Sequence, residues 1–223
     1  EAGVGKTRLK NELVVRAERR HMLIIEGRCS SFEINTPYYV WNTFLKSLLR
    51  VDPDTPEAEV RSRLHEMVKV LALEPDAPYL ASLLSLRSQE ILLEEDEERK
   101  TRMFSAARRL LNAYAERKRT VFVFEDLHWI DRFSQALLEF VLKEQQFAPA
   151  LIVCLFRPEY RDTERFGATG RQFDLDRLTG VQARELMRLR FNAESIPDQL
   201  AGLIEQRSEG NPFFIEEIIK TLF

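Results

Sequence analysis

The feature that most constrains this chain lies at its first residues. Glu1-Ala2-Gly3-Val4-Gly5-Lys6-Thr7 matches the last seven positions of the eight-residue pattern G-x-x-x-x-G-K-[ST]. In that pattern the glycines allow a tight loop, the lysine reaches the β- and γ-phosphates, and the hydroxyl binds Mg²⁺. A helical pattern follows at once from Arg8. The sequence therefore predicts a phosphate-binding loop at a helix N-terminus, with a nucleotide as its ligand. The alternative is a chance glycine-rich turn before a helix.

The leading glycine of the pattern and the apolar strand that normally enters such a loop do not precede Glu1. We therefore expect the chain to be an N-terminally truncated fragment. We also expect the absent strand to lie beside the strand that ends in Glu125, so that its loss leaves strand edges unpaired. On this expectation, residues 1–223 alone fold poorly and bind nucleotide weakly.

Short apolar segments alternate with helical patterns along the rest of the chain. Residues 22–27, 119–126 and 150–156 are predicted as strands, because each contains a continuous apolar run of the kind found in parallel strands covered on both faces. Residues 173–175 are predicted as a last short strand. Helical periodicity covers residues 8–20, 38–50, 57–73, 96–114, 134–143, 181–191, 197–206 and 212–223, and Pro75 and Pro78 are expected to break the helical region that they follow. This order predicts an α/β fold, the parallel sheet of a P-loop nucleoside triphosphatase without its first strand, flanked by helices and followed by a helical lid.

The domain organisation follows from these patterns. We expect a P-loop core over residues 1–178, with a helical insert at about residues 36–117, and the start of a helical lid subdomain over residues 179–223. The insert is much longer than an ordinary connection between two strands. We interpret it as an elaboration of the core and not as a separate domain.

Composition and charge exclude several classes of protein. Hydrophobic residues make up 44% of the 223 residues and charged residues 31%, which is typical of a soluble globular protein. The net charge of −3 gives no general attraction to nucleic acid or to anionic membranes, and the apolar runs are too short to span a bilayer. Cys29 and Cys154 are expected to be buried free thiols in a reducing cytoplasm, with a disulfide as the alternative. No Cys or His spacing suggests a metal site.

Two carboxylates, Glu125 and Asp126, follow the apolar run Val121–Phe124. A phosphate-binding loop needs an acidic group at the end of a neighbouring strand, to hold Mg²⁺ and orient the attacking water. The alternative is a strand that ends in solvated charges. Together with the loop, the pair predicts a site for nucleotide and Mg²⁺. No Asn-Lys-x-Asp or Thr-Lys-x-Asp tetrapeptide occurs, which favours adenine over guanine.

Three segments resemble the markers of bacterial STAND-type signalling ATPases, whose nucleotide domain is often described as an Orc1-like AAA ATPase domain. They are Glu1–Leu9, Phe124–Asp131 and Gly210-Asn211-Pro212-Phe213-Phe214. The resemblance covers nearly the whole chain. It implies ATP or ADP bound with Mg²⁺ between an α/β core and a helical lid, and slow hydrolysis that switches attached output and repeat domains. Those domains would lie outside this chain, and ATP-dependent homo-oligomers are a further implied partner.

The resemblance also implies roles for individual residues. Asp126 polarises water, Glu125 assists Mg²⁺, and Arg157 matches a γ-phosphate sensor. Family members more often carry Asp at the first acidic position, so the longer Glu125 puts the rate of hydrolysis in question. The implied nucleotide-binding residues are Gly3, Val4, Gly5, Lys6, Thr7, Arg8 and Pro212, and the implied Mg²⁺ ligands are Thr7 and Glu125. Alternatively, Arg157 is a solvated strand end, and Asn211 and Pro212 simply start a helix.

The leading function is therefore an ATP-dependent switch that hydrolyses ATP slowly. The first alternative is a non-hydrolysing scaffold in which bound nucleotide is structural. A DNA-binding AAA-type initiator is less favoured, because the chain is acidic overall and shows no basic reading helix.

Overall fold

The computed structural model describes residues 2–88, 91, 94–143, 150–160 and 170–222. Its strands are β1 (Leu23–Arg28), β2 (Thr120–Glu125) and β3 (Ala150–Cys154). Its α-helices are α1 (Lys6–Arg19), α2 (Tyr39–Leu49), α3 (Glu57–Leu71), α4 (Ala77–Leu83), α5 (Asp96–Arg117), α6 (Arg132–Lys143), α7 (Gly180–Phe191), α8 (Asp198–Ser208) and α9 (Pro212–Thr221). Two short 3-10 helices, η1 (Glu74–Asp76) and η2 (Leu127–Trp129), precede α4 and α6.

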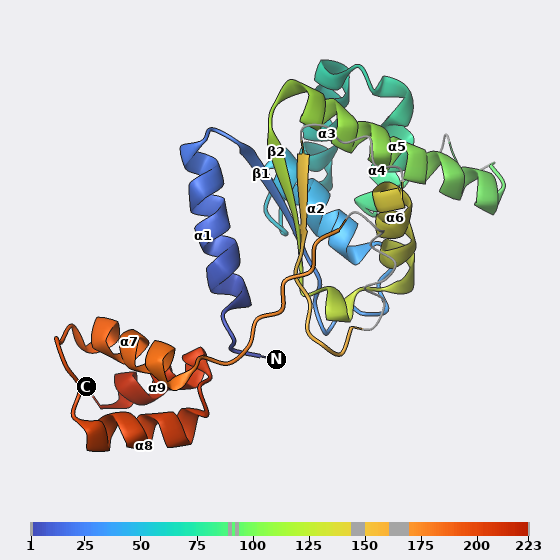
Figure 1. Ribbon diagram of the computed structural model, residues 1–223. Coiled ribbons are helices and arrows are strands. Elements are labelled where there is room, and N and C mark those ends of the chain that lie inside the picture. The colour runs from blue at the N-terminus through green and yellow to red at the C-terminus, as the bar shows by residue number, and fades with distance from the viewer. Residues whose placement is uncertain (1, 89–90, 92–93, 144–149, 161–169, 223) are drawn as a thin grey trace. The chain divides into compact units, whose positions relative to one another are not determined.

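The described strands form one parallel sheet in the order β1-β2-β3 (Figure 1). Leu23 pairs with Thr120 at one end of β1 and Arg28 with Glu125 at the other. All six residues of β2 are buried, as its continuous apolar sequence predicts for a central strand. The α/β prediction, a parallel sheet flanked by helices in a P-loop fold, is confirmed.

The core forms where α2 packs on the sheet. Trp41 and Phe44 lie one turn apart on α2, and Phe122 and Phe124 lie on the same face of β2 because they are two residues apart. The Phe44 and Phe124 rings stack with centroids 5.2 Å apart, and Trp41 lies 5.2 Å from Phe124. All four side chains are at most 1% exposed. Helices α2 to α6 share this core with the sheet.

The outer edge of β1 is covered by hydroxyl groups of α2. The Arg28 N–H donates to Thr43 Oγ1 (3.0 Å), and Thr43 Oγ1 lies 3.2 Å from the Arg28 carbonyl oxygen. The Glu26 N–H points to Ser47 Oγ at 3.5 Å. Edge strands need such cover because their unpaired backbone groups can otherwise pair with strands of other molecules.

This arrangement corrects one expectation. We expected the strand that enters the phosphate loop to lie beside the strand carrying Glu125. In the described sheet both edges of β2 are already occupied, by β1 and β3. Because α2 covers the outer edge of β1, the open edge among the described strands is that of β3. Any further strand of this sheet would pair there.

Thr43→Val is expected to lower the free energy of unfolding by about 1 kcal/mol, because the isosteric side chain leaves the Arg28 N–H without its hydroxyl acceptor. Urea denaturation measures the change. Ser47→Ala is the matched control and should cost less, since its oxygen lies at the limit of hydrogen-bond distance. Equal stability of Thr43→Val and wild type would show that the hydroxyl does not protect this edge.

One local prediction is wrong. Residues 173–175, Phe-Asp-Leu, form no strand, and Phe173 is 78% exposed. A segment this short is not held without a partner strand. The break expected at the prolines is confirmed, because α3 ends at Leu71, before Pro75. Pro78 lies in the first turn of the next helix, α4, where the missing N–H of proline costs no hydrogen bond.

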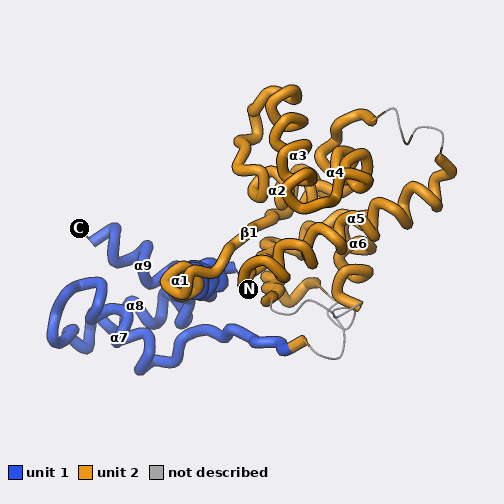
Figure 2. The backbone as a smooth tube through the Cα atoms, turned by 90° about the horizontal axis from the view of Figure 1, so that it is seen from above, with its two compact units in different colours: residues 1–14, 171–223 blue, residues 15–170 orange. Residues whose placement is uncertain are grey.

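The chain divides into two compact units, coloured separately in Figure 2. Unit 1 comprises residues 1–14 and 171–223, and unit 2 comprises residues 15–170. Unit 1 has a small core of its own around Met187, Ile204 and Ile215. The predicted division at residue 178 between a P-loop core and a lid stays a prediction. Within the described residues, no helix has the length and apolar character needed to cross a membrane.

Candidate nucleotide-binding site

The predicted phosphate loop has the backbone that its glycines allow. Gly3 has φ +80° and Gly5 has φ +103°, a region that side-chain-bearing residues rarely adopt. The Gly5 carbonyl accepts the Leu9 N–H at 2.9 Å, so the helical ladder of α1 starts there. The N–H groups of the first turn have no carbonyl within the helix, and this turn contains no acidic residue. Such a helix N-terminus suits an anion.

The space beside Gly5 is open. Apart from the residues adjoining Gly5 in the chain, no described atom lies within 4 Å of the position that a Cβ on Gly5 would take, so a ligand could approach the backbone there. Val4 is 8% exposed and anchors the loop, whereas Thr7 and Arg8 face solvent. Lys6, Thr7 and the backbone N–H groups are the donors and oxygen ligand that a nucleotide phosphate with Mg²⁺ requires.

The Gly210-Asn211-Pro212 turn lies against this loop within unit 1. Asn211 Nδ2 donates to the Ala2 carbonyl at 2.9 Å, and the Phe213 N–H points to the Gly3 carbonyl at 3.3 Å. Asn211 Oδ1 also accepts from the Phe213 N–H at 3.1 Å, as a helix N-cap does. The structure therefore places the predicted residue Pro212, the first residue of α9, next to the loop that carries Gly3.

An ion-pair cluster joins α9 to the start of α1. Arg8 Nη1 lies 3.6 Å from Glu216 Oε1, and Arg190 Nε donates to the same oxygen at 3.0 Å. The Arg8 side chain is 64% exposed, so the pair contributes little stability by itself. The ion pair nevertheless places Glu216 of α9 beside the loop, because Arg8 directly follows Lys6 and Thr7.

In unit 2 the two predicted carboxylates end β2. Glu125 is 9% exposed, and its carbonyl accepts the Cys29 N–H at 3.0 Å. Asp126 has φ +58°, a left-handed conformation that Asp tolerates better than most residues. Arg28, which ends β1, donates from Nε to Asp126 Oδ2 at 3.0 Å. This ion pair could not be predicted from any local pattern, since it joins residues 98 positions apart.

Arg157 lies at the same end of the sheet. The Leu155 N–H donates to the Phe124 carbonyl at 2.9 Å, and the Leu127 N–H donates to the Leu155 carbonyl at 3.0 Å. These bonds continue the pairing of the two chain segments beyond β3. The Arg157 guanidinium lies 5.3 Å from the centroid of the Trp129 ring. Unit 2 therefore brings Glu125, Asp126 and Arg157 to the carboxyl end of the strands. The Arg157 guanidinium lies over the aromatic ring of Trp129.

A second aspartate, Asp131, bonds the starts of α2 and α6. It is 5% exposed, and its carboxylate accepts the N–H groups of Tyr38 and Tyr39 before α2 and of Phe133 and Ser134 in α6. This role of Asp131 was not among the predicted ones. The position of Asp131 directly before a helix start was a readable N-cap signal.

Burial keeps the thiols of the two cysteines protonated and unreactive. Both are free thiols, Cys29 buried and Cys154 partly so. Desolvation raises the pKa of the Cys29 thiol well above its usual range, and the charges of Asp131 and Asp126 raise it further. Desolvation raises the pKa of Cys154 to about 12. Neither thiol is a thiolate at neutral pH, so neither is a candidate nucleophile.

The described residues contain no group of three or more His, Cys, Asp or Glu side chains placed to hold a metal. A magnesium that takes most of its ligands from nucleotide phosphates and water does not need one.

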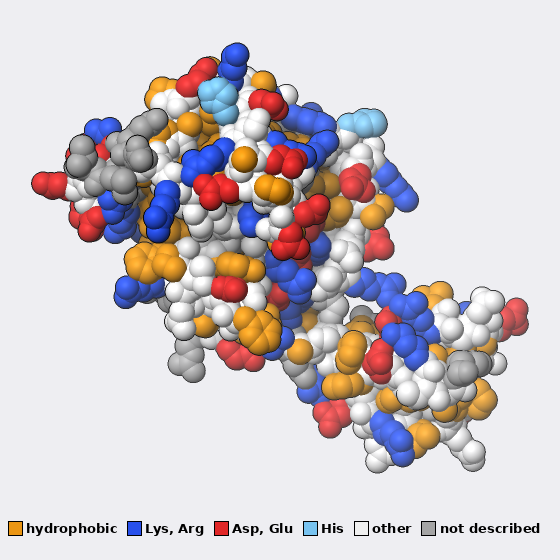
Figure 3. All heavy atoms as spheres, turned by 180° about the vertical axis from the view of Figure 1, so that it is seen from behind, with side chains coloured by type: hydrophobic (Ala, Val, Ile, Leu, Met, Phe, Trp, Pro, Cys, Tyr) orange, Lys and Arg blue, Asp and Glu red, His pale blue; other side chains and the backbone are white. Residues whose placement is uncertain are grey.

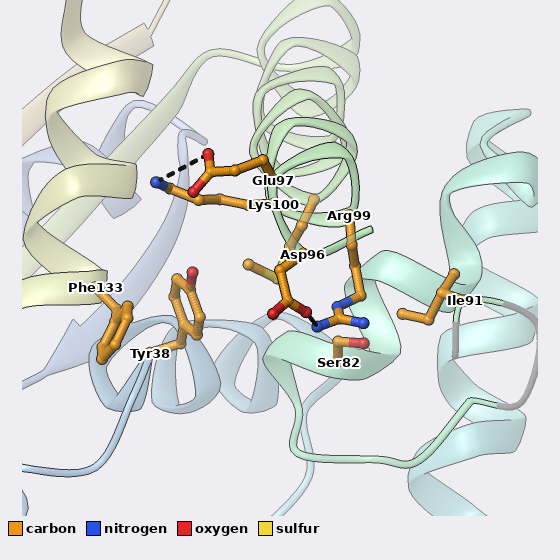
Figure 4. A pocket seen from close by; sticks show the side chains of 9 residues that line it. Tyr38, Ser82, Ile91, Asp96, Glu97, Arg99, Lys100 and Phe133 are labelled. Carbon is orange, nitrogen blue, oxygen red and sulfur yellow. Dashed lines mark hydrogen bonds and ion pairs between the residues drawn. The ribbon is translucent and has the colours of Figure 1, made fainter. Parts of the chain in front are cut away.

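Unit 2 also contains a cavity of about 410 Å³, which Figure 4 shows from close by. Tyr38 and Phe133 line one end of it, and Met103 is also among the lining residues. Its cations Arg99 and Lys100 pair with Asp96 and Glu97 of the same helix. The cavity therefore offers no charge complementarity to a phosphate.

Comparison with known proteins agrees with these features. The chain belongs to the AAA ATPase domain family, which it matches over residues 1–153. It is thus an AAA-type P-loop ATPase domain, a nucleotide-binding module of a family that generally uses nucleotide with Mg²⁺. Residues 180–223 match a second family, described as a domain of unknown function (DUF8739).

An uncharacterized protein of Rhizobium meliloti (strain 1021) is similar to the chain, with 28% identity over 233 residues. The match covers 98% of this chain but 22% of that relative's length. No solved structure matches the chain.

Proposed function

We propose that this domain is the ATP-binding switch module of a multidomain signalling or regulatory protein of the STAND type, with an Orc1-like nucleotide domain. It binds ATP or ADP with Mg²⁺, hydrolyses ATP slowly, and transmits the difference to attached output and repeat domains or to an ATP-dependent homo-oligomer. Two free thiols fit a reducing compartment such as the cytoplasm. The observation that carries the proposal is the phosphate loop, whose two left-handed glycines lead into α1.

Each residue of the loop has a distinct task in this proposal. Gly3, Val4 and Gly5 present their backbone to the phosphates, Lys6 offers an ammonium to the terminal phosphates, and Arg8 and Pro212 border the nucleotide. Thr7 supplies a hydroxyl to Mg²⁺. Bound Mg²⁺ would neutralise charge that develops on the phosphates.

The carboxylates supply the reaction chemistry. Asp126 orients and polarises the attacking water, Glu125 assists Mg²⁺, and Arg157 senses the terminal phosphate. Slow turnover is consistent with the state of Asp126, because one of its carboxylate oxygens already accepts a hydrogen bond from Arg28. The Arg28 guanidinium takes one of the several acceptor positions of this carboxylate and so competes with the attacking water for it.

Lys6→Ala tests the proposal. ATP affinity, measured by equilibrium dialysis with the protein at its full natural length, is expected to fall at least tenfold, since a charged hydrogen bond contributes about 1.5–3 kcal/mol. Lys10→Ala changes the same residue type one turn further along α1 and should alter affinity less than about twofold. Equal affinities of the wild type and Lys6→Ala would show that this loop does not bind the phosphates.

A non-hydrolysing scaffold is the second candidate. The Arg28–Asp126 ion pair favours the scaffold function, because it restrains the carboxylate that would have to polarise the attacking water. It predicts tight nucleotide binding with no turnover above background. A DNA-binding initiator has less support, because basic and acidic side chains are interspersed on the face shown in Figure 3. Salt-dependent DNA binding would be its signature.

A further inference from the structure

The Asn211 side chain makes two hydrogen bonds that serve different segments. Its Oδ1 accepts the Phe213 N–H at 3.1 Å and so caps α9. Its Nδ2 donates to the Ala2 carbonyl at 2.9 Å, 209 positions away in the chain. The first bond is what any N-cap makes, whereas the second leaves the helix and holds the entry of the phosphate loop.

The contact is closely packed. Asn211 is 2% exposed, so its amide is shielded from competing water. A Cβ on Gly3 would come within 2.6 Å of Asn211 Oδ1 and 2.9 Å of Phe213 Cβ. The loop backbone can approach α9 this closely only because residue 3 is a glycine.

The loop and the helix also share a donor. The Phe213 N–H lies 3.1 Å from Asn211 Oδ1 and 3.3 Å from the Gly3 carbonyl. The first turn of α9 therefore bonds the loop through its backbone as well as through the Asn211 amide. Movement of the loop at Gly3 would disturb the start of α9.

A pure helix cap would not require asparagine. Ser, Asp and Asn are about equally good N-caps because each places an oxygen near the backbone N–H of the first turn. Of the three, only asparagine combines that oxygen with N–H groups able to reach a carbonyl. The amide is therefore the part of the side chain that capping does not explain.

From these contacts we infer that Asn211 is a positioning residue of the phosphate loop, and that it couples the order of the loop to the docking of α9. The inference rests on the proposed nucleotide-binding role of the loop. A loop already held in its binding conformation loses less conformational entropy when phosphate binds. Because coupling is reciprocal, nucleotide in the loop also strengthens the docking of α9.

The test is Asn211→Ser, which keeps a capping oxygen and removes the amide. Hydrogen exchange of the backbone amides of residues 3–8 is measured without nucleotide, and ATP affinity is measured separately. Exchange in the loop is expected to quicken about fivefold and ATP affinity to fall about fivefold, the equivalent of one hydrogen bond of about 1 kcal/mol. Exchange in α9 beyond its first turn should remain unchanged.

Thr179→Ala is the matched control, because Thr179 caps α7 in the same unit through a capping box with Gln182. It should lower stability as a lost cap does, without changing loop exchange. Equal effects of the two variants on loop exchange, or no effect of Asn211→Ser, would overturn the inference. The exchange measurement decides it even if the wild type binds no nucleotide, an outcome that would refute the proposed function alone.

Discussion

Replacing Asp131 with alanine is expected to lower the free energy of unfolding by about 3 kcal/mol. Its Oδ1 accepts the N–H groups of Tyr38 (3.2 Å), Phe133 (3.0 Å) and Ser134 (2.9 Å), and its Oδ2 accepts that of Tyr39 (3.3 Å). Alanine leaves two helix starts without a cap at once. The loss of a cap costs about 0.5–2 kcal/mol, and the loss of a hydrogen bond to a charged group costs more than the loss of a neutral one.

Urea denaturation with a spectroscopic signal measures this effect. Asp131→Asn keeps one carbonyl oxygen in place and should destabilise less than alanine. Asp52→Ala, in an exposed loop, should change stability by less than about 0.5 kcal/mol. A loss below about 1 kcal/mol for Asp131→Ala would mean that water or another group replaces the carboxylate at these helix starts.

Asp126→Asn is expected to reduce ATP turnover at least a hundredfold while ATP affinity changes only a few-fold. Asparagine has nearly the same shape as aspartate but cannot accept a proton or polarise water as a carboxylate does, and general-base catalysis contributes about 10²–10⁴-fold. Phosphate release under saturating ATP measures turnover. Asp54→Asn, in an exposed loop, makes the same chemical change away from β2 and should leave turnover unaffected.

The companion variant Arg28→Ala distinguishes two readings of the ion pair. If Arg28 restrains Asp126, its removal raises turnover, whereas a positioning role predicts a decrease. Undiminished turnover in Asp126→Asn would remove Asp126 from the reaction. A wild type without turnover would favour the scaffold function.

The sequence predicted the sheet well because its signals are local. The continuous apolar run of β2 and the two acids that end it specify a buried strand and its polar edge within a few residues. The segment 173–175 alternates two apolar residues with an aspartate over only three positions, and a strand also needs a partner edge that no local pattern reveals. The helix break at Pro75 and Pro78 could be predicted because proline acts locally, but the sequence did not show that Pro78 would lie in the first turn of the next helix.

In the candidate site, too, only the part that is contiguous in sequence could be predicted. Gly3 to Thr7 could be read directly, because a phosphate loop is contiguous in sequence. The partners of Asp126 and Ala2 could not, since Arg28 and Asn211 reach them only after the chain has folded. The neighbour of the central strand was predicted wrongly for the same reason, because strand order depends on how helices such as α2 close the sheet edges.

Nucleotide binding is measured most directly by a calorimetric titration of the wild-type protein, at its full natural length, with ATP in the presence of Mg²⁺ and again in EDTA. We expect saturable binding of one ATP per chain, weakened in EDTA and displaced by ADP but poorly by GTP. Absence of saturable binding under both conditions, or GTP binding as tight as ATP, would contradict the proposed function.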